Sequence, residues 1–206
     1  MEEVLDTYAE SYDSEYPVIC FDEKSYQLLE HIIEPLPPAP GHPARVDYEY
    51  KRCGTVNLFI AFKPLTGQRT VTVTERRSNQ EFAAQMQALH LRYPEAKKIR
   101  LVLDQLSTHT PSALYEYLPP EEAKLLTRRF EWVYTPKHAS WLNMAEIEWS
   151  VLERQCLRRR LATFEELNYE VKDWETDRNR RSVKVNWQFN TDHARLKLNR
   201  RYPTRV

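Results

Sequence analysis

Three acidic residues lie where strands and a helix would bring their carboxylates together. Asp22 directly follows the apolar run PVICF, Asp104 ends the run IRLVLD, and Glu146 lies early in a helix predicted after a basic loop. Ligands of open α/β sheets bind at the carboxyl ends of neighbouring strands, so Asp22 and Asp104 would meet if their strands were adjacent. Two close carboxylates repel each other and are held ionised by a divalent cation, for which oxygen ligands favour Mg²⁺ or Mn²⁺.

A third carboxylate from the helix would complete a site for two metal ions. Such a site suits phosphodiester cleavage, because the two ions activate the attacking oxygen and stabilise the leaving oxygen. Each acid also has an ordinary interpretation. A carboxylate at a strand end is commonly a loop residue, and Glu146 could form a capping box with Asn143 at the start of the helix.

The helix offers two candidates for the third ligand, Glu146 and Glu148. Positions two apart on a helix of 3.6 residues per turn differ by roughly 200°, so only one of them can face the metal ions. Glu148 falls beside the apolar stripe, where its stem could cover apolar surface while its carboxylate stays in water. Glu146 falls on the other side, close to the loop that holds Lys137 and His138. The pattern therefore favours Glu146 as the ligand and leaves Glu148 as an accessory residue.

The elements that would position these acids follow from apolar periodicity and from turn and cap signals. Strands are predicted at 17–21, 56–62, 69–75, 99–104 and 130–134, and helices after Ser78, at 110–118, from 119, after Asn143, after Thr163 and at 191–199. Residues 56–62 and 69–75 should form a hairpin, and Ser78 with Glu81 a capping box. This order predicts an α/β fold with a mixed sheet flanked by helices.

Length and composition indicate one domain over residues 1–206 that needs no metal or disulfide for stability. Residues 1–16 form an acidic lead-in, and the proline-rich residues 35–43 are predicted to be an extended surface insertion. The three cysteines are scattered, which favours free thiols. The sequence shows neither a signal peptide nor an apolar stretch of about 20 residues, so we expect a cytoplasmic protein without a membrane span.

Basic residues are in excess after residue 50, with runs at 158–160 and 178–181. Such runs suit a polyanion such as nucleic acid, although solvated helix faces produce them too. Candidates for contact with DNA phosphates or bases are Lys137, His138, Trp141, Arg158, Arg159 and Arg160, because cations neutralise the backbone and aromatic rings stack on bases. The alternative for each is an ordinary polar loop residue or an exposed helix position.

Four segments resemble the DDE transposases of bacterial insertion sequences in the mariner superfamily: PVICFDEKS, LVLDQLSTHT, YTPKHASWLNMAEIEWSVLERQCL and VNWQFNTDHARLKL. The resemblance covers nearly the whole chain. It implies a ribonuclease H-like fold and cut-and-paste DNA transposition, with Asp22, Asp104 and Glu146 as catalytic ligands of two Mg²⁺ or Mn²⁺ ions. It also implies that His109 lies near the reacting phosphate.

The same resemblance implies transposon ends and target DNA as partners, a homodimer in the synaptic complex, and action at the bacterial nucleoid. Helix-turn-helix domains precede the catalytic domain in that family, and none precedes Asp22 here, so we expect this chain to be the catalytic part alone. The alternative function is a non-catalytic transposase remnant that binds nucleic acid or another protein.

Overall fold

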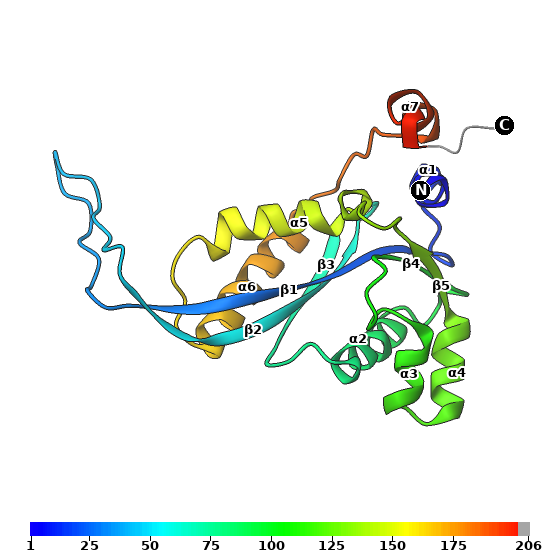
Figure 1. Ribbon diagram of the computed structural model, residues 1–206, viewed down its shortest axis with the longest axis horizontal. Helices are drawn as coiled ribbons and strands as arrows, with labels where there is room; N and C mark the ends of the chain where they lie inside the picture. The colour runs from blue at the N-terminus through cyan, green and yellow to red at the C-terminus, as the bar shows by residue number, and fades with distance from the viewer. Residues whose placement is uncertain (202–206) are drawn as a thin grey trace.

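The computed structural model describes residues 1–201, and it is built around a mixed five-stranded sheet (Figure 1). The strands are β1 (Val18–His31), β2 (Tyr50–Lys63), β3 (Gln68–Thr74), β4 (Ile99–Leu103) and β5 (Phe130–Tyr134), in the order β3-β2-β1-β4-β5. The first three strands are antiparallel neighbours, whereas β4 runs parallel to both β1 and β5. The predicted mixed sheet and the hairpin of β2 and β3 are therefore confirmed.

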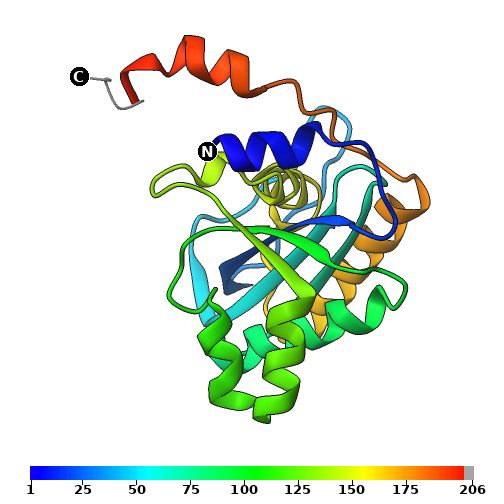
Figure 2. The same cartoon turned by 90° about the vertical axis from the view of Figure 1, so that its right-hand side faces the viewer.

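Helices cover both faces of this sheet (Figures 1 and 2). In chain order they are α1 (Glu2–Ala9), α2 (Asn79–Arg92), α3 (Pro111–Tyr117), α4 (Pro120–Arg129), α5 (Ala145–Leu152), α6 (Phe164–Arg180) and α7 (Thr191–Lys197). Two 3₁₀ turns span Ser140–Leu142 and Asn199–Arg201, and α5 continues into a π-helical turn, Glu153–Leu157. None of the helices within residues 1–201 has the length and apolar character needed to cross a membrane.

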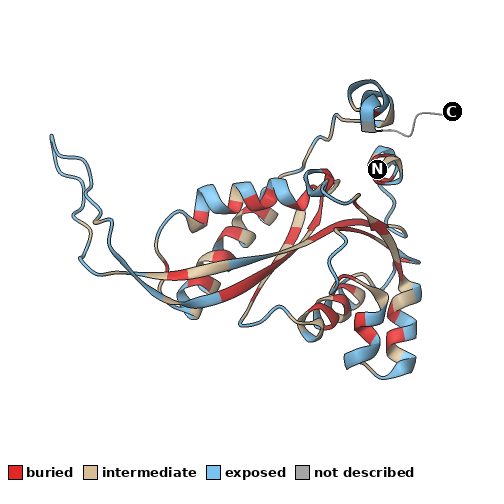
Figure 3. Cartoon of the chain, in the orientation of Figure 1, coloured by how far each residue is buried: buried red, intermediate tan, exposed pale blue. Residues whose placement is uncertain are grey.

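The two faces of the sheet carry separate apolar cores. On one face, Phe82 of α2, Leu114 of α3 and Leu126 of α4 pack on side chains of β1 and β4. On the other face, Trp149 of α5 and Val171 of α6 pack on side chains of β1, β2 and β3. Figure 3 shows the buried positions concentrated along the sheet and on the inner sides of these helices. The predicted capping box of Ser78 and Glu81 begins α2, and the Thr163 hydroxyl caps α6.

β1 is much longer than the predicted strand at 17–21. Only Val18–Cys20 pairs with β4, but β1 continues to His31 in an antiparallel ribbon with β2. Asp22 therefore lies within β1, at the point where pairing with β4 ends. The sequence pattern missed this extension because, beyond Phe21, most side chains of β1 are exposed or half-buried and the apolar run stops.

Residues 32–49, here called the arm, connect β1 to β2 and project away from the sheet (Figure 1). Two isolated bridges, Leu36 with Arg45 and Ala39 with His42, hold its two halves together. Figure 3 shows the arm as almost wholly exposed, which includes the proline-rich residues 35–43.

Part of the acidic lead-in is helical, which the sequence analysis did not predict. Helix α1 forms because Val4 and Leu5 are buried, at 0% and 1% exposure, in the core on the α5 face of the sheet. It lies beside α7, where the Thr191 hydroxyl donates to the Asp6 carboxylate at 2.8 Å (Figure 2). Helices from the two ends of the described chain are thus in contact with each other.

Candidate active site

The sheet register brings Asp22 and Asp104 to one place. Cys20 of β1 pairs with Val102 of β4, and each aspartate stands two residues beyond that pair on adjacent parallel strands. The prediction that Asp22 and Asp104 meet because their strands are adjacent is therefore confirmed. Asp104 directly follows the last residue of β4 and is partly exposed.

Asp22 lies in a largely desolvated position. One carboxylate oxygen accepts a hydrogen bond from the backbone N–H of Glu23 at 2.9 Å, and the other accepts one from the indole N–H of Trp149 at 3.0 Å. Burial and the nearby carboxylates of Glu146 and Asp104 raise the pKa of Asp22, the two hydrogen bonds lower it, and the net result is a pKa of about 7.

Glu146 is exposed and lies in the first turn of α5, close enough to Asp22 to raise its pKa. The start of α5 is tied to β1 by Asn143, whose amide N–H donates to the Phe21 carbonyl at 2.8 Å. The Asn143 side-chain oxygen accepts from the N–H of Ala145, while its own backbone N–H donates to Ser140. That N–H is thus not bound to Glu146, and the capping-box alternative for Glu146 is wrong.

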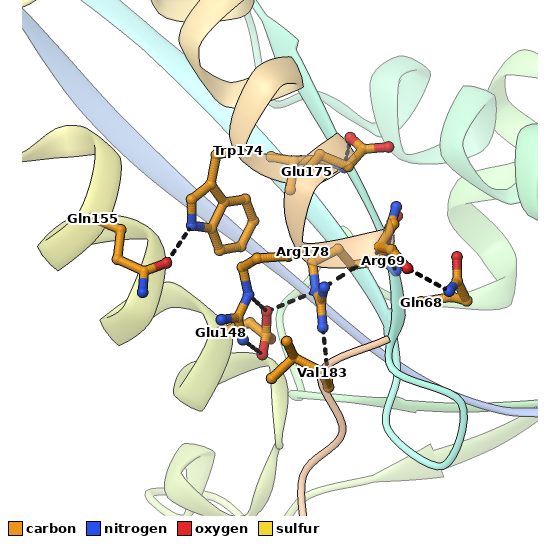
Figure 4. Close-up of polar contacts among 10 residues, drawn as sticks. Gln68, Arg69, Glu148, Gln155, Trp174, Glu175, Arg178 and Val183 are labelled. Carbon is orange, nitrogen blue, oxygen red and sulfur yellow. Dashed lines mark hydrogen bonds and ion pairs between the residues drawn. The ribbon is translucent and has the colours of Figure 1, made fainter. Parts of the chain in front are cut away.

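Glu148 does not point into water as the sequence analysis predicted. Its side chain is 1% exposed and forms ion pairs with Arg69 of β3 and Arg178 of α6, on the side of α5 that packs against α6 (Figure 4). Nothing in the local pattern of α5 announces these partners, because they come from residues far away in the chain. Glu148 is therefore an internal ion-pair residue, and Glu146 is the only one of the two near Asp22.

His109 is buried between two carboxylates. Its Nδ1 lies 2.6 Å from Asp104 Oδ1, its Nε2 lies 3.6 Å from Glu23 Oε2, and Arg77 lies 3.5 Å from the other Glu23 oxygen. Burial by itself lowers the pKa of His109, but Asp104 and Glu23 outweigh this and raise the pKa to about 9. A protonated His109 thus fixes the orientation of Asp104. The sequence analysis missed Glu23, although alternation along β1 places it on the face opposite to Asp22.

The three acids are neighbours rather than a closed ligand set. Among residues 1–201, no three acidic, histidine or cysteine side chains are already gathered tightly enough to hold a metal ion. This is expected of carboxylates that repel one another until a cation is present. The donor set still fits a divalent ion, because three carboxylates are hard oxygen ligands that leave coordination positions open, as Mg²⁺ and Mn²⁺ require.

Some of the candidate DNA-contact residues are exposed, and others are engaged in contacts within the chain. Lys137, His138 and Trp141 line a hollow of about 330 Å³ in the loop before α5, and all three are exposed. Arg158 is exposed, but Arg159 forms an ion pair with Glu170. The guanidinium of Arg160 donates to backbone carbonyls of residues 47–49, so it anchors the base of the arm.

The raised pKa of Asp22 makes a testable prediction for metal-free protein. A folded-state pKa of about 7, above the ordinary value of ~4, means that the stabilising contribution of the proton is complete below about pH 4 and is lost as pH rises through 7. Asp22→Asn cannot ionise, so with a chelator at pH 8 it should unfold with a free energy on the order of 1–3 kcal/mol higher than the parent.

Urea unfolding of both proteins between pH 4 and pH 8 measures this difference. The advantage of Asp22→Asn should grow with pH and should shrink when Mn²⁺ is added, since the cation stabilises only the parent carboxylate. If the free energies of unfolding of the two proteins changed with pH in parallel, ionisation of Asp22 would not destabilise the fold.

Comparison with known proteins gives one family and a set of structures. The family described as DDE superfamily endonuclease matches residues 17–168. No curated protein sequence matches the chain. Similar solved structures include the Mos1 mariner paired-end complex with Mn (TM-score 0.59, 16% identity), which matches 88% of this chain and 57% of the Mos1 chain.

Two further Mos1 structures are similar to this chain. They are the paired-end complex with the left transposon end (TM-score 0.59, 15% identity, 88% and 57% coverage) and the strand transfer complex (TM-score 0.57, 14% identity, 85% and 53% coverage). This likeness confirms the predicted ribonuclease H-like fold. The described chain spans little more than half the length of these Mos1 chains.

Proposed function

Because this chain belongs to the DDE superfamily of endonucleases, we propose that it is the catalytic domain of a transposase, with Asp22, Asp104 and Glu146 as its metal ligands. The observation that carries the proposal is the desolvated Asp22 carboxylate, whose pKa is raised by burial and by the carboxylates of Glu146 and Asp104. A divalent cation would remove this repulsion and draw the three ligands together.

The reaction we propose is cleavage of DNA followed by strand transfer. In cleavage, water loses a proton and attacks the phosphorus, the bond from phosphorus to the 3′ oxygen breaks, and that oxygen takes a proton to leave a 3′-OH. In transfer, this 3′-OH loses its proton and its oxygen bonds to a phosphorus of the target DNA, while the bond from that phosphorus to the target's own 3′ oxygen breaks and the released oxygen takes a proton. Bound Mg²⁺ or Mn²⁺ ions, two in this proposal, would activate the attacking oxygen and neutralise charge on the leaving oxygen. Within the chain, Trp149 orients Asp22, and His109 orients Asp104.

Nicking of supercoiled DNA tests this proposal. The purified chain should convert supercoiled to open-circular DNA with Mg²⁺ or Mn²⁺ but not with Ca²⁺, which tolerates looser coordination geometry. Asp22→Asn and Asp104→Asn should each abolish nicking while remaining folded. If both variants nick as fast as the parent, the activity comes from another site. A folded parent that binds DNA yet never nicks it would favour the alternative, a non-catalytic remnant.

We propose that DNA reaches the acids along the loop before α5. Lys137, His138 and Trp141 support this because they are exposed in the hollow beside the start of α5, five to nine residues before Glu146 in the chain. Exposed cations bind phosphates, and an exposed indole can stack on a base. Arg158 remains a candidate on the same grounds of exposure and charge.

We further propose that two copies of this chain act together on two DNA ends, at the chromosomal DNA in the bacterial cytoplasm. The Mos1 neighbours are paired-end complexes, and the arm of this chain exposes large apolar side chains such as Ile32, Leu36 and Tyr48, which suits a protein partner. Sedimentation of the chain with short duplexes should show two chains per complex. One chain per complex at saturating protein would contradict this arrangement.

A further inference from the structure

Three buried charged residues, Arg69, Glu148 and Arg178, form an ion triad on the side of α5 away from Glu146. Glu148 accepts hydrogen bonds from Arg178 Nη2 at 2.8 Å and from Arg178 Nε at 3.3 Å, and Arg69 Nε lies 2.7 Å from the same carboxylate (Figure 4). The exposed fractions are 1% for Glu148, 1% for Arg69 and 7% for Arg178. The triad thus joins α5 to the edge strand β3 and to α6 by direct contacts between charged side chains.

Further contacts fix the two arginines in place. Arg69 donates to the Val183 carbonyl at 2.7 Å, and both guanidinium groups lie over the Trp174 ring, at 5.9 Å for Arg69 and 5.3 Å for Arg178. Trp174 in turn donates its indole N–H to Gln155, which follows α5 (Figure 4). Each charged group is therefore held from more than one element.

The edge of β3 is joined to α6 in the same region. The Asn179 side chain accepts from the Arg69 N–H and donates to the Arg69 carbonyl, both at 2.8 Å, and the Glu175 carboxylate accepts from the Val71 N–H at 2.9 Å. These contacts satisfy backbone groups that an edge strand would otherwise leave open. The arginines of the triad are consequently attached to a rigid support.

The triad lies on the side of α5 away from Glu146. Glu148 is next to Trp149, which donates to Asp22, and it is two residues after Glu146, roughly 200° away around the helix. Together with Asn143, which ties the helix start to the Phe21 carbonyl, it fixes α5 at two points within two turns. A small rotation of α5 would move Trp149 and Glu146 relative to Asp22.

Stability alone does not account for such a triad. Burying three charges has a large desolvation cost, and well-packed apolar replacements of similar volume are often neutral or stabilising. Apolar contacts, however, are non-directional, whereas the forked guanidinium of Arg178 binds a carboxylate in one orientation. What the charged triad adds over an apolar core is therefore a defined rotation of the helix.

We propose that Arg69, Glu148 and Arg178 are positioning residues, which set the rotation of α5 so that Trp149 holds Asp22 and Glu146 faces it. The inference rests on the proposed role of Glu146 as a metal ligand. It also predicts a consequence in metal-free protein, the hydrogen bond from the Trp149 indole to Asp22. That consequence can be measured without any catalytic activity.

The decisive variant replaces the whole triad by apolar side chains, Arg69→Met, Glu148→Leu and Arg178→Met together. In metal-free protein, the Trp149 indole N–H resonance, assigned with Trp149→Phe, should shift and its exchange with deuterium should become at least roughly tenfold faster. The dissociation constant for Mn²⁺ should rise roughly tenfold. Loss of the net positive triad would by itself strengthen cation binding, so a weaker affinity reports position rather than charge.

Glu153→Gln is the matched control, because it breaks an exposed ion pair with Lys24 just beyond α5 and should leave both measurements unchanged. Should the apolar triad not fold, Arg178→Lys replaces it, since lysine keeps the charge but loses the forked geometry. A folded triad variant, or Arg178→Lys, with the parental indole resonance and Mn²⁺ affinity overturns the inference. Failure of the proposed function looks different: Asp22→Asn would then bind Mn²⁺ and nick DNA like the parent.

Discussion

Replacing Glu146 by Gln should abolish metal-dependent nicking, with a loss of roughly a thousandfold or more, while the melting temperature stays within about 2 °C of the parent. Glu146 is exposed, so the fold loses little when its charge is removed. The proposed metal site, in contrast, loses one of its three anionic ligands. Because the Glu146 carboxylate raises the pKa of Asp22, the same variant should also lower the Asp22 pKa toward its ordinary range.

Initial nicking rates at saturating Mn²⁺, with thermal melts of the same samples, measure this effect. Gln keeps the size of Glu and loses only its charge, so a Glu146 without a role in metal binding would leave nicking intact. Trp149→Phe provides a useful intermediate, since it removes only the indole donor to Asp22 and should weaken Mn²⁺ binding without removing a ligand. Parental activity of Glu146→Gln would exclude Glu146 from the metal site.

Glu148→Gln should differ from Glu146→Gln by a large loss of stability. The variant leaves two buried guanidinium groups without a counter-charge, and breaking a buried ion pair in this way costs about 3–5 kcal/mol. For a chain of this size that corresponds to a fall in melting temperature of about 10 °C. Urea unfolding of Glu148→Gln and of the parent measures this difference in the free energy of unfolding, independently of any nicking assay.

Glu153→Gln is again the control, since an exposed ion pair contributes only about 0.2–1 kcal/mol. Measuring both stability and nicking for Glu146→Gln and Glu148→Gln distinguishes a metal ligand from a buried ion-pair residue. A Glu148→Gln variant as stable as the parent, but inactive, would mean that Glu148 and not Glu146 binds the metal ions.

The sequence predicted the parts of this molecule that depend on local pattern. The strands of the β2–β3 hairpin, the capping box at Ser78 and the convergence of Asp22 with Asp104 all follow from periodicity, turn chemistry and strand order. Apolar periodicity placed α5 correctly, and helix geometry separated Glu146 from Glu148. These features need no knowledge of partners elsewhere in the chain.

The remaining features arise from contacts between distant segments. The ribbon of β1 beyond Phe21 is stabilised by pairing with β2 rather than by its own apolar pattern, and α1 forms because Val4 and Leu5 reach a core built by other elements. The Arg160 guanidinium binds carbonyls of the arm, a contact that the local sequence around Arg160 does not predict. The partners of Glu148 lie 79 residues before it and 30 residues after it, beyond the reach of any local pattern.

The central claim is that Asp22, Asp104 and Glu146 hold the divalent ions, and a crystal structure of the protein soaked in Mn²⁺ tests it most directly. Anomalous scattering identifies manganese without assumptions about ligands. We predict manganese bound by these three carboxylates, with Glu148 still paired to Arg69 and Arg178. Manganese bound elsewhere, or no manganese between these acids at a concentration that supports nicking, would contradict the account.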